Sequence, residues 1–500
     1  MPLRHKNKVT RLLLLSLLLS SCAVGPNYHK PELPLPGAYA NNTSKSSTID
    51  PALWWKSLGD KNLDKLIDQA IIANPQLDIA LTHLQEAREQ EAAVTGEALP
   101  EAGASIGAGR GNGSDLARGR ADQSLVSAED TGKLSRVSQI SGFDAAWEVD
   151  LFGKYRREIE AAHYDKQAAK AARNNILITV IADVVRSYVD LRSLQMQQAV
   201  LNNNIHVATE YVNFVQQRYD RGITNGLDLT LAQRELSTLK SQAAPLQSQI
   251  DGMQYTLAVL CGQYPENMVK ELSEPGVIPT MPEKLDTGLP LDLLRHRPDI
   301  IEAERELASA NAQIGIATAN LFPHLVLTGG AGYQSQGIGL SPVGKSFIWS
   351  VGPSVNWALL DFGTLDAMVN IADLNSHAML MNYKQKVLDA VREVDSAASN
   401  YNAQQDRLKN LHEALEASQQ AVSIATQRYD RGLTDSLNVI DAERQQFDLE
   451  QQYVIAQQNA AEQFIMLYKA LGSGWEHYQK FPAIRRPLPA VIAALRRSVE

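Results

Sequence analysis

The sequence predicts a mainly α-helical fold with a smaller β part, built from a duplicated helical hairpin. The run Arg-Tyr-Asp-Arg-Gly at residues 218–222 recurs unchanged at residues 428–432. Each copy ends a stretch without glycine or proline, residues 154–221 and 364–431, although the chain contains 31 Gly and 21 Pro. Each stretch would form a helix roughly 100 Å long. Two rods of equal length that end in the same turn indicate a tandem repeat.

Apolar residues in both stretches alternate in steps of four and three, the heptad spacing of a left-handed coiled coil. The first series runs from Val180 to Tyr219, and the second occupies the equivalent positions of the second repeat. The same period continues after the first turn, from Leu236 to Leu260. We therefore expect each long helix to pack against the helix that returns from its turn. Shorter helices are expected at about 60–98 and 292–321.

Two segments alternate with a period of two, which is typical of strands. They predict β-hairpins at about 101–150 and 323–360, with strands of about ten residues, the length that crosses a bilayer at a tilt. An open sheet of four strands leaves backbone groups unpaired in lipid. We therefore expect three chains to form a 12-stranded β-barrel, with four strands per chain, continuous with a trimeric α-barrel.

The N-terminus has the pattern of a secretory signal at residues 1–21, because basic residues precede an apolar run. Leu19-Ser20-Ser21-Cys22 resembles a bacterial lipobox, in which Cys22 carries the lipid; the alternative is an ordinary signal with an incidental cysteine. The absence of Asp after Cys22 favours sorting to the outer membrane. Residues 22–58 would form an arm that ends at Trp54-Trp55, an aromatic pair expected to dock on the body.

Cys261 has no intrachain partner and lies in an apolar stretch, so we expect a buried structural thiol.

The repeats also predict the domain organisation. The expected segments are a first repeat at 59–262 with its helical hairpin at 153–262, an equatorial linker at 263–290, a second repeat at 291–474 with its helical hairpin at 363–472, and a C-terminal extension at 475–500.

Composition and motifs argue against an enzyme. The net charge of −9 disfavours nucleic acid as a partner. The ten His residues show no metal-ligand spacing, and no Gly-rich phosphate loop precedes a helix. The acidic residues Glu302, Glu304 and Glu306 are expected on a solvated helix face. We expect no catalytic residue, no metal site and no cofactor.

Six motifs together resemble the TolC-like outer-membrane factors, most closely the lipoprotein efflux channels of the NodT type. They are the lipobox, Gly25-Pro26-Asn27-Tyr28, the Trp54-Trp55 pair, the segments 297–304 and 315–323, and both Arg-Tyr-Asp-Arg-Gly turns. The resemblance covers nearly the whole mature chain. It implies a homotrimer in the lipid of the outer membrane that passively conducts drugs or other small solutes. A periplasmic adaptor and an inner-membrane transporter are the implied partners.

In that family the helical turns form the periplasmic tip, where the adaptor docks and the channel narrows. The resemblance therefore assigns docking to Gly222, Thr224, Gly432 and Thr434. The glycines can end the long helices in the left-handed conformation. The threonines would start the returning helices or contact the adaptor. The alternative for these residues is helix-turn structure alone.

The resemblance also implies a constriction and a latch. Asp441 would point into the pore and form a three-fold carboxylate ring, and Asn438 stands where some members have a second Asp; the alternative is a solvated surface Asp. Tyr429 would bond Asp228 and hold the tip shut. Arg218 and Arg428 would complete this network or act as cations at helix C-termini.

Two other functions remain open from the sequence. A lipid-anchored coiled-coil scaffold without a pore would need no strands of bilayer length. A type I protein-secretion channel would share the fold, although the lipobox and the aromatic pair favour drug or metal efflux. The exported compound cannot be read from the sequence.

Overall fold

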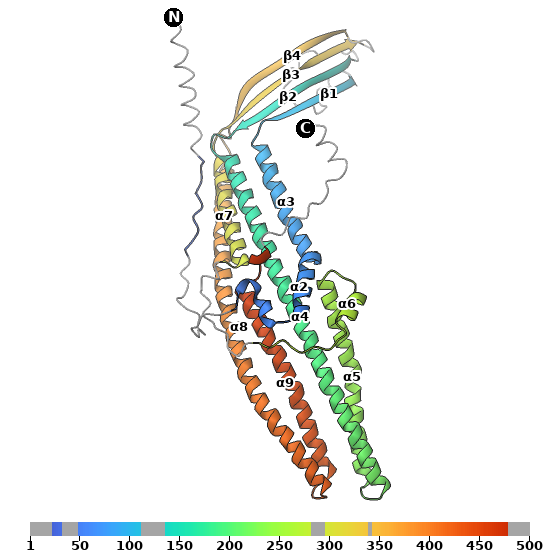
Figure 1. The fold of residues 1–500 in the computed structure, drawn as a ribbon. Helices are drawn as coiled ribbons and strands as arrows, with labels where there is room; N and C mark the ends of the chain where they lie inside the picture. The colour runs from blue at the N-terminus through green and yellow to red at the C-terminus, as the bar shows by residue number, and fades with distance from the viewer. Residues whose placement is uncertain (1–22, 33–48, 112–135, 282–295, 339–342, 479–500) are drawn as a thin grey trace. The chain divides into compact units, whose positions relative to one another are not determined.

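The computed structural model describes residues 23–32, 49–111, 136–281, 296–338 and 343–478, and it confirms a mainly helical chain with four antiparallel strands (Figure 1). Helices α4 and α8 each have 67 residues, and α5 and α9 each have 35. The elements in chain order are η1 (Pro51–Leu58), α2 (Lys61–Ala73), α3 (Pro75–Glu97), β1 (Glu101–Gly111), β2 (Arg136–Val149), α4 (Lys154–Asp220), α5 (Gly226–Leu260), α6 (Pro265–Glu271), α7 (Pro298–Ala319), β3 (His324–Ile338), β4 (Val343–Asn356), α8 (Thr364–Asp430), α9 (Ser436–Ala470) and η3 (Glu476–Tyr478).

The chain divides into two compact units. The first comprises 1–32, 84–169 and 303–383, and the second comprises 33–83, 170–302 and 384–500. The expected signal peptide and Cys22 lie outside the described residues. So do residues 33–48 of the expected arm, the strand connections 112–135 and 339–342, the linker residues 282–290 and the end of the C-terminal extension.

The sheet of the first unit has the order β1-β2-β3-β4, with all neighbouring strands antiparallel. Its strands have 11 to 15 residues, somewhat longer than the sequence predicted. Trp147 lies opposite Leu327, and Leu327 lies opposite Pro353, so these side chains share one face. The same registers place further apolar side chains on that face, namely Ile106, Phe143, Tyr333, Phe347, Trp349, Val351 and Val355. All seven of these are exposed.

The opposite face of the sheet is made of small and polar residues. Gly142, Gly332 and Ile348 are aligned across three strands, and Asp144, Gly330 and Ser350 form the next such row. One face is therefore mainly apolar and carries the large exposed side chains, and the other is mainly small and polar, with Val326 and Ile348 as exceptions. Within the described chain, β1 and β4 each have only one strand neighbour.

The helix expected over 60–98 is in fact two helices, α2 and α3. Asn74 has an extended backbone, and Pro75 begins the next helix. The buried Asn74 side chain accepts hydrogen bonds from the N–H groups of Gln76 and Leu77 at 2.9 and 3.2 Å, and it donates to the carbonyl oxygen of Leu260 at 2.8 Å. Because this one amide caps α3 and also contacts α5, the break is a fixed structural feature.

The aromatic pair docks in the second unit, as predicted. Trp54 and Trp55 are 1% and 2% exposed. Trp54 stacks on Tyr468 of α9 at 5.4 Å between ring centroids and meets Phe464 edge-on at 6.0 Å, while Trp55 stacks on Tyr478 at 6.3 Å. These rings form an aromatic cluster in the core, which the heptad pattern did not predict.

The heptad positions of α4 and α5 pack together, as expected from their period. The seam also receives Phe447 from α9, and its other residues are Val200, Leu201, Ile205, Ala208, Leu236, Leu239, Ala243 and Leu246. Helix α5 continues through Pro245, although proline removes one backbone N–H donor from the helix. Cys261 is a free, fully buried thiol, as predicted, and burial raises its pKa to about 11. The expected linker contains a short helix, α6.

Arg297 joins three helices of the second unit. It donates to the Ala470 carbonyl oxygen at the end of α9 at 2.5 Å, to Asp299 at 2.7 Å and to Glu393 of α8 at 2.9 Å. Gly472 follows α9 in the left-handed conformation, and a Cβ there would lie 2.5 Å from the Arg297 Cγ atom. Arg297, at the start of the segment 297–304, therefore has a structural role and connects α7, α8 and α9.

Glu304 corrects the sequence interpretation of that segment. It was expected on a solvated face, but it is 1% exposed. The hydroxyl group of Tyr28, from the N-terminal arm, donates to it at 2.5 Å, and Arg305 forms an ion pair with it at 2.6 Å. A donor that is distant in sequence makes this burial possible.

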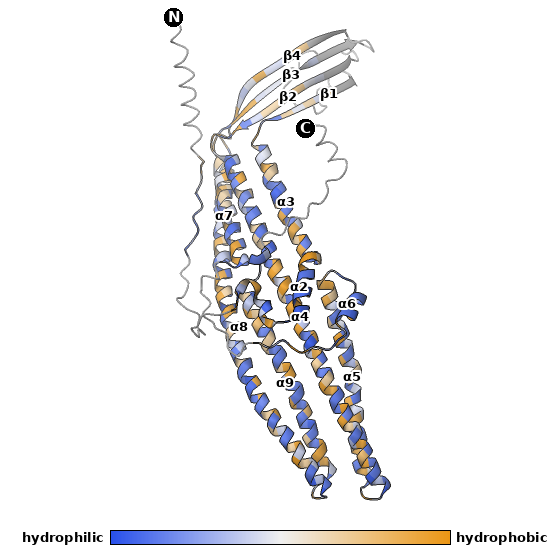
Figure 2. Cartoon of the chain, viewed as in Figure 1, coloured by the Kyte–Doolittle hydropathy of each residue, from blue (hydrophilic) through white to orange (hydrophobic). Residues whose placement is uncertain are grey.

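Apolar and polar residues intermix along every long helix (Figure 2). Among the described helices, none combines the length and the apolar character required to span a membrane.

Candidate functional site

The two Arg-Tyr-Asp-Arg-Gly turns have the same geometry. Gly222 and Gly432 adopt φ values of 71° and 70°, the left-handed region that favours glycine. In the first turn the Gly222 N–H donates to the Tyr219 carbonyl oxygen at 2.8 Å, and the Ile223 N–H donates to that of Arg218 at 2.9 Å. The second turn repeats both bonds at 2.9 Å. These paired bonds are a Schellman motif, so the glycines end α4 and α8 as predicted.

The threonines do not start the returning helices. The residues that precede α5 and α9 are Asn225 and Asp435, and the Asn225 side chain accepts from the Asp228 N–H at 3.0 Å. Thr224 instead donates its hydroxyl hydrogen to the Asp228 carboxylate. In the second repeat the Thr434 hydroxyl accepts from the side-chain amide of Asn438 at 2.6 Å. Each threonine therefore braces the first turn of the next helix.

One hydrogen bond links the two turns. Ser436 is fully buried, and its hydroxyl donates to the Asp228 carboxylate at 2.8 Å. The position equivalent to Ser436 in the first repeat is Gly226, which has no hydroxyl. The divergence of the repeats just after the glycines therefore creates a contact between the two hairpins. The sequence showed this divergence but not the contact that it makes.

The expected Tyr429–Asp228 bond is not formed within the single chain. Tyr429 is 6% exposed, and its hydroxyl oxygen has no hydrogen-bond partner among the described residues. The Arg218 guanidinium lies over its ring at 5.1 Å and over that of Phe214 at 5.6 Å. Tyr211 lies 6.3 Å away, measured between ring centroids. Arg218 and Tyr429 thus meet through a cation–π contact across α4 and α8.

The other candidate residues lie near the same turns. Asn438 and Asp441 are exposed on the first turns of α9, and Arg428 is exposed at the end of α8. Asn438 also donates to Asp435 at 3.3 Å, so its amide is committed to its own turn. Asp441 is therefore the more available of the two for a neighbouring molecule.

Glu443, two residues after Asp441 on α9, was not singled out from the sequence. Burial, together with the nearby Glu235 carboxylate of α5, raises the pKa of its carboxyl to about 7. Glu443 follows Ser436 by seven residues and precedes Phe447 by four, so it occupies a heptad position of the seam. A charged residue at such a position is unusual, and this was the signal in the sequence that could have identified it. The tip therefore holds a carboxyl group that titrates near neutral pH.

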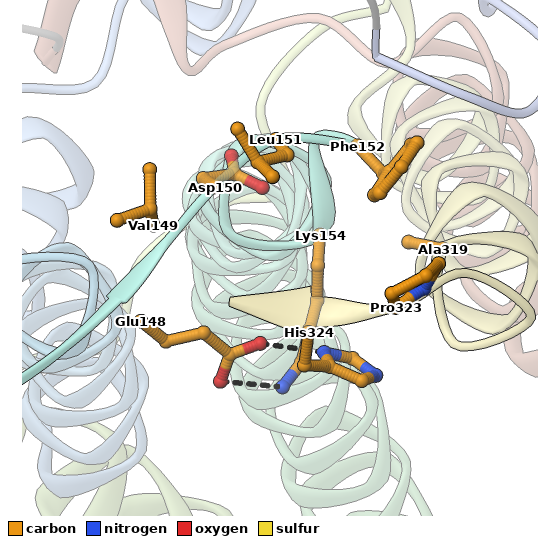
Figure 3. Close-up of a pocket in the computed structure, with 9 residues that line it drawn as sticks. All are labelled: Glu148, Val149, Asp150, Leu151, Phe152, Lys154, Ala319, Pro323 and His324. Carbon is orange, nitrogen blue, oxygen red and sulfur yellow. Dashed lines mark hydrogen bonds and ion pairs between the residues drawn. The ribbon is translucent and has the colours of Figure 1, made fainter. Parts of the chain in front are cut away.

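A small pocket lies in the first unit, where β2 leads into α4 and α7 leads into β3 (Figure 3). Glu148 pairs with His324 at 2.6 Å and with Lys154 at 3.8 Å, and Tyr155 donates to it at 3.0 Å. The space is about the size of one water molecule. This space is too small for an organic solute, so we interpret the residues around it as a fixed polar connection between strands and helices.

Comparisons with known proteins agree with this architecture. A family model described as outer membrane efflux protein matches residues 66–263 and 289–473. Nodulation protein T of Rhizobium leguminosarum bv. trifolii is 29% identical over 474 residues, covering 93% of this chain and 97% of that protein. The cation efflux system protein CusC of Escherichia coli O6:H1 is 27% identical over 467 residues, covering 92% and 97%. The solved outer-membrane channel OprN is 32% identical with a TM-score of 0.79, covering 91% of this chain and all of that chain.

Long helical hairpins combined with a four-stranded antiparallel sheet define an outer-membrane channel. The chain belongs to the outer membrane efflux protein family. It is an outer-membrane channel of efflux systems in a Gram-negative bacterium, and not an enzyme.

Proposed function

We propose that three copies of this chain form one channel, which passes small solutes from a periplasmic adaptor and an inner-membrane transporter to the exterior. The amphipathic sheet is the observation that carries the proposal. One face exposes the aromatic and aliphatic side chains described above, and the other face is small and polar. A lipid-facing exterior and a water-filled lumen require this division.

The two sheet edges support a trimer. Strands β1 and β4 end the sheet of one chain, and their free backbone groups would be costly in lipid. Pairing β4 of one copy with β1 of the next removes both edges, and three copies of four strands give the 12-stranded closure expected from the sequence. A scaffold without a pore gives no reason for an exposed apolar face of this extent.

We assign the constriction and the docking surface to the turns of the second unit. Asp441 is exposed and lies close to the turn, so three copies would form a carboxylate ring that attracts cations. Tyr429 and Asp228 form the latch if a neighbouring chain or a rearranged tip brings them together. The exposed side chains of Ile223, Leu227, Leu433 and Leu437 supply apolar surface for the adaptor.

The lipid anchor belongs to the same proposal. The lipobox at residues 19–22 assigns it to Cys22. An acyl anchor and the sheet would then hold the channel in the outer membrane, since a single acyl chain binds only marginally.

Conductance of the purified protein in planar lipid bilayers tests the function. We expect discrete single-channel steps, and we expect Asp441→Ala to raise the resting conductance and weaken block by divalent cations. Asp448→Ala is a matched control, because Asp448 is an exposed aspartate two turns further along α9. Absence of any conductance from protein that cross-links as a trimer would refute the channel, and equal effects of both substitutions would refute the ring.

A further inference from the structure

The described start of the chain occupies a groove between α4 and α7. The Val24 N–H donates to the Phe152 carbonyl oxygen at 3.0 Å. Asn311 of α7 donates to the Pro26 carbonyl oxygen at 3.1 Å, and Tyr28 donates to Glu304 at 2.5 Å. Six consecutive residues, 23–28, are thus held at both ends and in the middle. We call this segment the docked arm.

Arg157 of α4 makes three further hydrogen bonds to the docked arm. Its Nε atom donates to the Val24 carbonyl oxygen at 3.1 Å, and its Nη2 atom donates to the Gly25 carbonyl oxygen at 3.1 Å and to the Asn27 side chain at 2.9 Å. The residue is only 3% exposed, and its remaining bond goes to Glu160 at 2.7 Å. A buried guanidinium group without its hydrogen-bond acceptors destabilises the folded protein. The docked arm and Arg157 therefore stabilise each other's position.

Three glycines give the groove its shape. A Cβ on Gly25 would lie 2.4 Å from the Cα atom of Gly315, and one on Gly153 would lie 2.6 Å from the Cα atom of Ala23. Backbone therefore meets backbone at both places, which no side chain would allow. Gly25 and Gly153 also have φ values of 84° and 85°. The groove is complementary to a peptide that bends at a glycine in this position.

The docked arm begins beside the junction of strands and helices. Phe152, which accepts the Val24 bond, stacks on Phe322 at 4.6 Å between ring centroids. These two residues lie where β2 leads into α4 and where α7 leads into β3. Because consecutive Cα atoms are about 3.8 Å apart, a lipid on the residue before Ala23 would leave the protein beside this junction.

We propose that the groove between α4 and α7 is a binding site for the mature N-terminus of this chain, and that Arg157 is the positioning residue that holds it there. The peptide, and not the lipid, carries the docking. The consequence for the membrane anchor rests on the proposed lipidation of Cys22. Docking itself depends only on the contacts between the docked arm and the two helices.

Hydrogen exchange of the mature, acylated protein, read by mass spectrometry on fragments that resolve the Val24 amide, tests the proposal, because the Val24 N–H donates to Phe152. We expect slow exchange of this amide in the wild type and equally slow exchange in Cys22→Ser, which cannot be acylated. Arg157→Met should accelerate exchange at least about tenfold, because three hydrogen bonds to a charged group are lost. Arg173→Met is the matched control on the same helix, because Arg173 donates to Asn174 of α4.

Two further variants keep the test decisive if Arg157→Met disturbs the helices. Asn27→Ala removes one acceptor from the arm side and leaves the groove intact, and it should accelerate exchange several-fold. A Cβ at Gly315 would lie 2.8 Å from the Cγ and Nε atoms of Arg157, so Gly315→Ala should displace that side chain and release the docked arm. Gly96→Ala should not release it, because a Cβ at Gly96 meets nothing within 4 Å. Peptides from α7 report whether each variant is folded.

Rapid exchange of the docked arm in the wild type would overturn the proposal. So would release of the docked arm by Cys22→Ser alone, since docking would then depend on the lipid. Equal exchange in Asn27→Ala, Gly315→Ala and their controls would remove the assigned role of the groove. None of these readings requires conductance, so failure of the channel and failure of the docking site are distinguishable.

Discussion

Replacement of Ser436 by alanine tests whether the bond between the two turns holds the tip closed. The Ser436 hydroxyl is fully buried and donates to the Asp228 carboxylate at 2.8 Å. A hydrogen bond to a charged group contributes about 1.5–3 kcal/mol. Thr224 continues to bond Asp228 in the variant, so the lower end of that range applies. If only the closed tip makes the bond, Ser436→Ala shifts the equilibrium toward the open tip by roughly tenfold in each chain.

Single-channel recording in planar bilayers would measure this shift as an increased open probability, and hydrogen exchange of residues 224–230 would report loosening of the turn. Ser237→Ala is the control, because the exposed Ser237 bonds only to the Gln233 carbonyl oxygen of its own helix. An open probability that equals the wild type, together with unchanged exchange at the turn, would show that the bond does not hold the gate.

Three further predictions concern stability and reactivity. Burial and the Glu235 carboxylate raise the pKa of Glu443 to about 7, so its contribution to stability is fully present below about pH 4.5 and is lost as the pH rises through about 7. The free energy of unfolding should fall by up to about 3 kcal/mol over this window. Glu443→Gln should therefore flatten the pH dependence of hydrogen exchange at the tip, and an unaltered slope contradicts the assignment. Arg297→Met should destabilise the protein by about 3–5 kcal/mol, seen as a lower denaturation midpoint, whereas the exposed Arg392→Met should leave that midpoint within error. The buried Cys261 thiol, with its pKa near 11, should react with a disulfide reagent only on unfolding, and rapid reaction at pH 8 in the native protein would show that its site opens.

The duplication, the long helices and the hairpins could be predicted because each depends on a local period. The break at Asn74 was missed, where the side chain replaces the helical bonds and contacts a carbonyl group far along the chain. The burial of Glu304 was also missed, because its donor, Tyr28, lies 276 residues away. The contact of Ser436 depends on the register between two hairpins, which no single-helix pattern encodes. Non-local partners therefore account for the omissions of Glu304 and Ser436, whereas Asn74-Pro75 was a local signal of a helix boundary that was overlooked.

The apolar face of the sheet has a consequence for how the chain is made. The second unit carries its own aromatic core around Trp54 and Phe464, so its large aromatic side chains are buried without lipid. The strands of the first unit, by contrast, would present Trp349, Val351 and their neighbours to the periplasm if they formed early. Such a surface favours aggregation between chains in transit. We therefore expect biogenesis in a fixed order, with the helical part structured first and the strands ordered last, on contact with the bilayer and with sister chains.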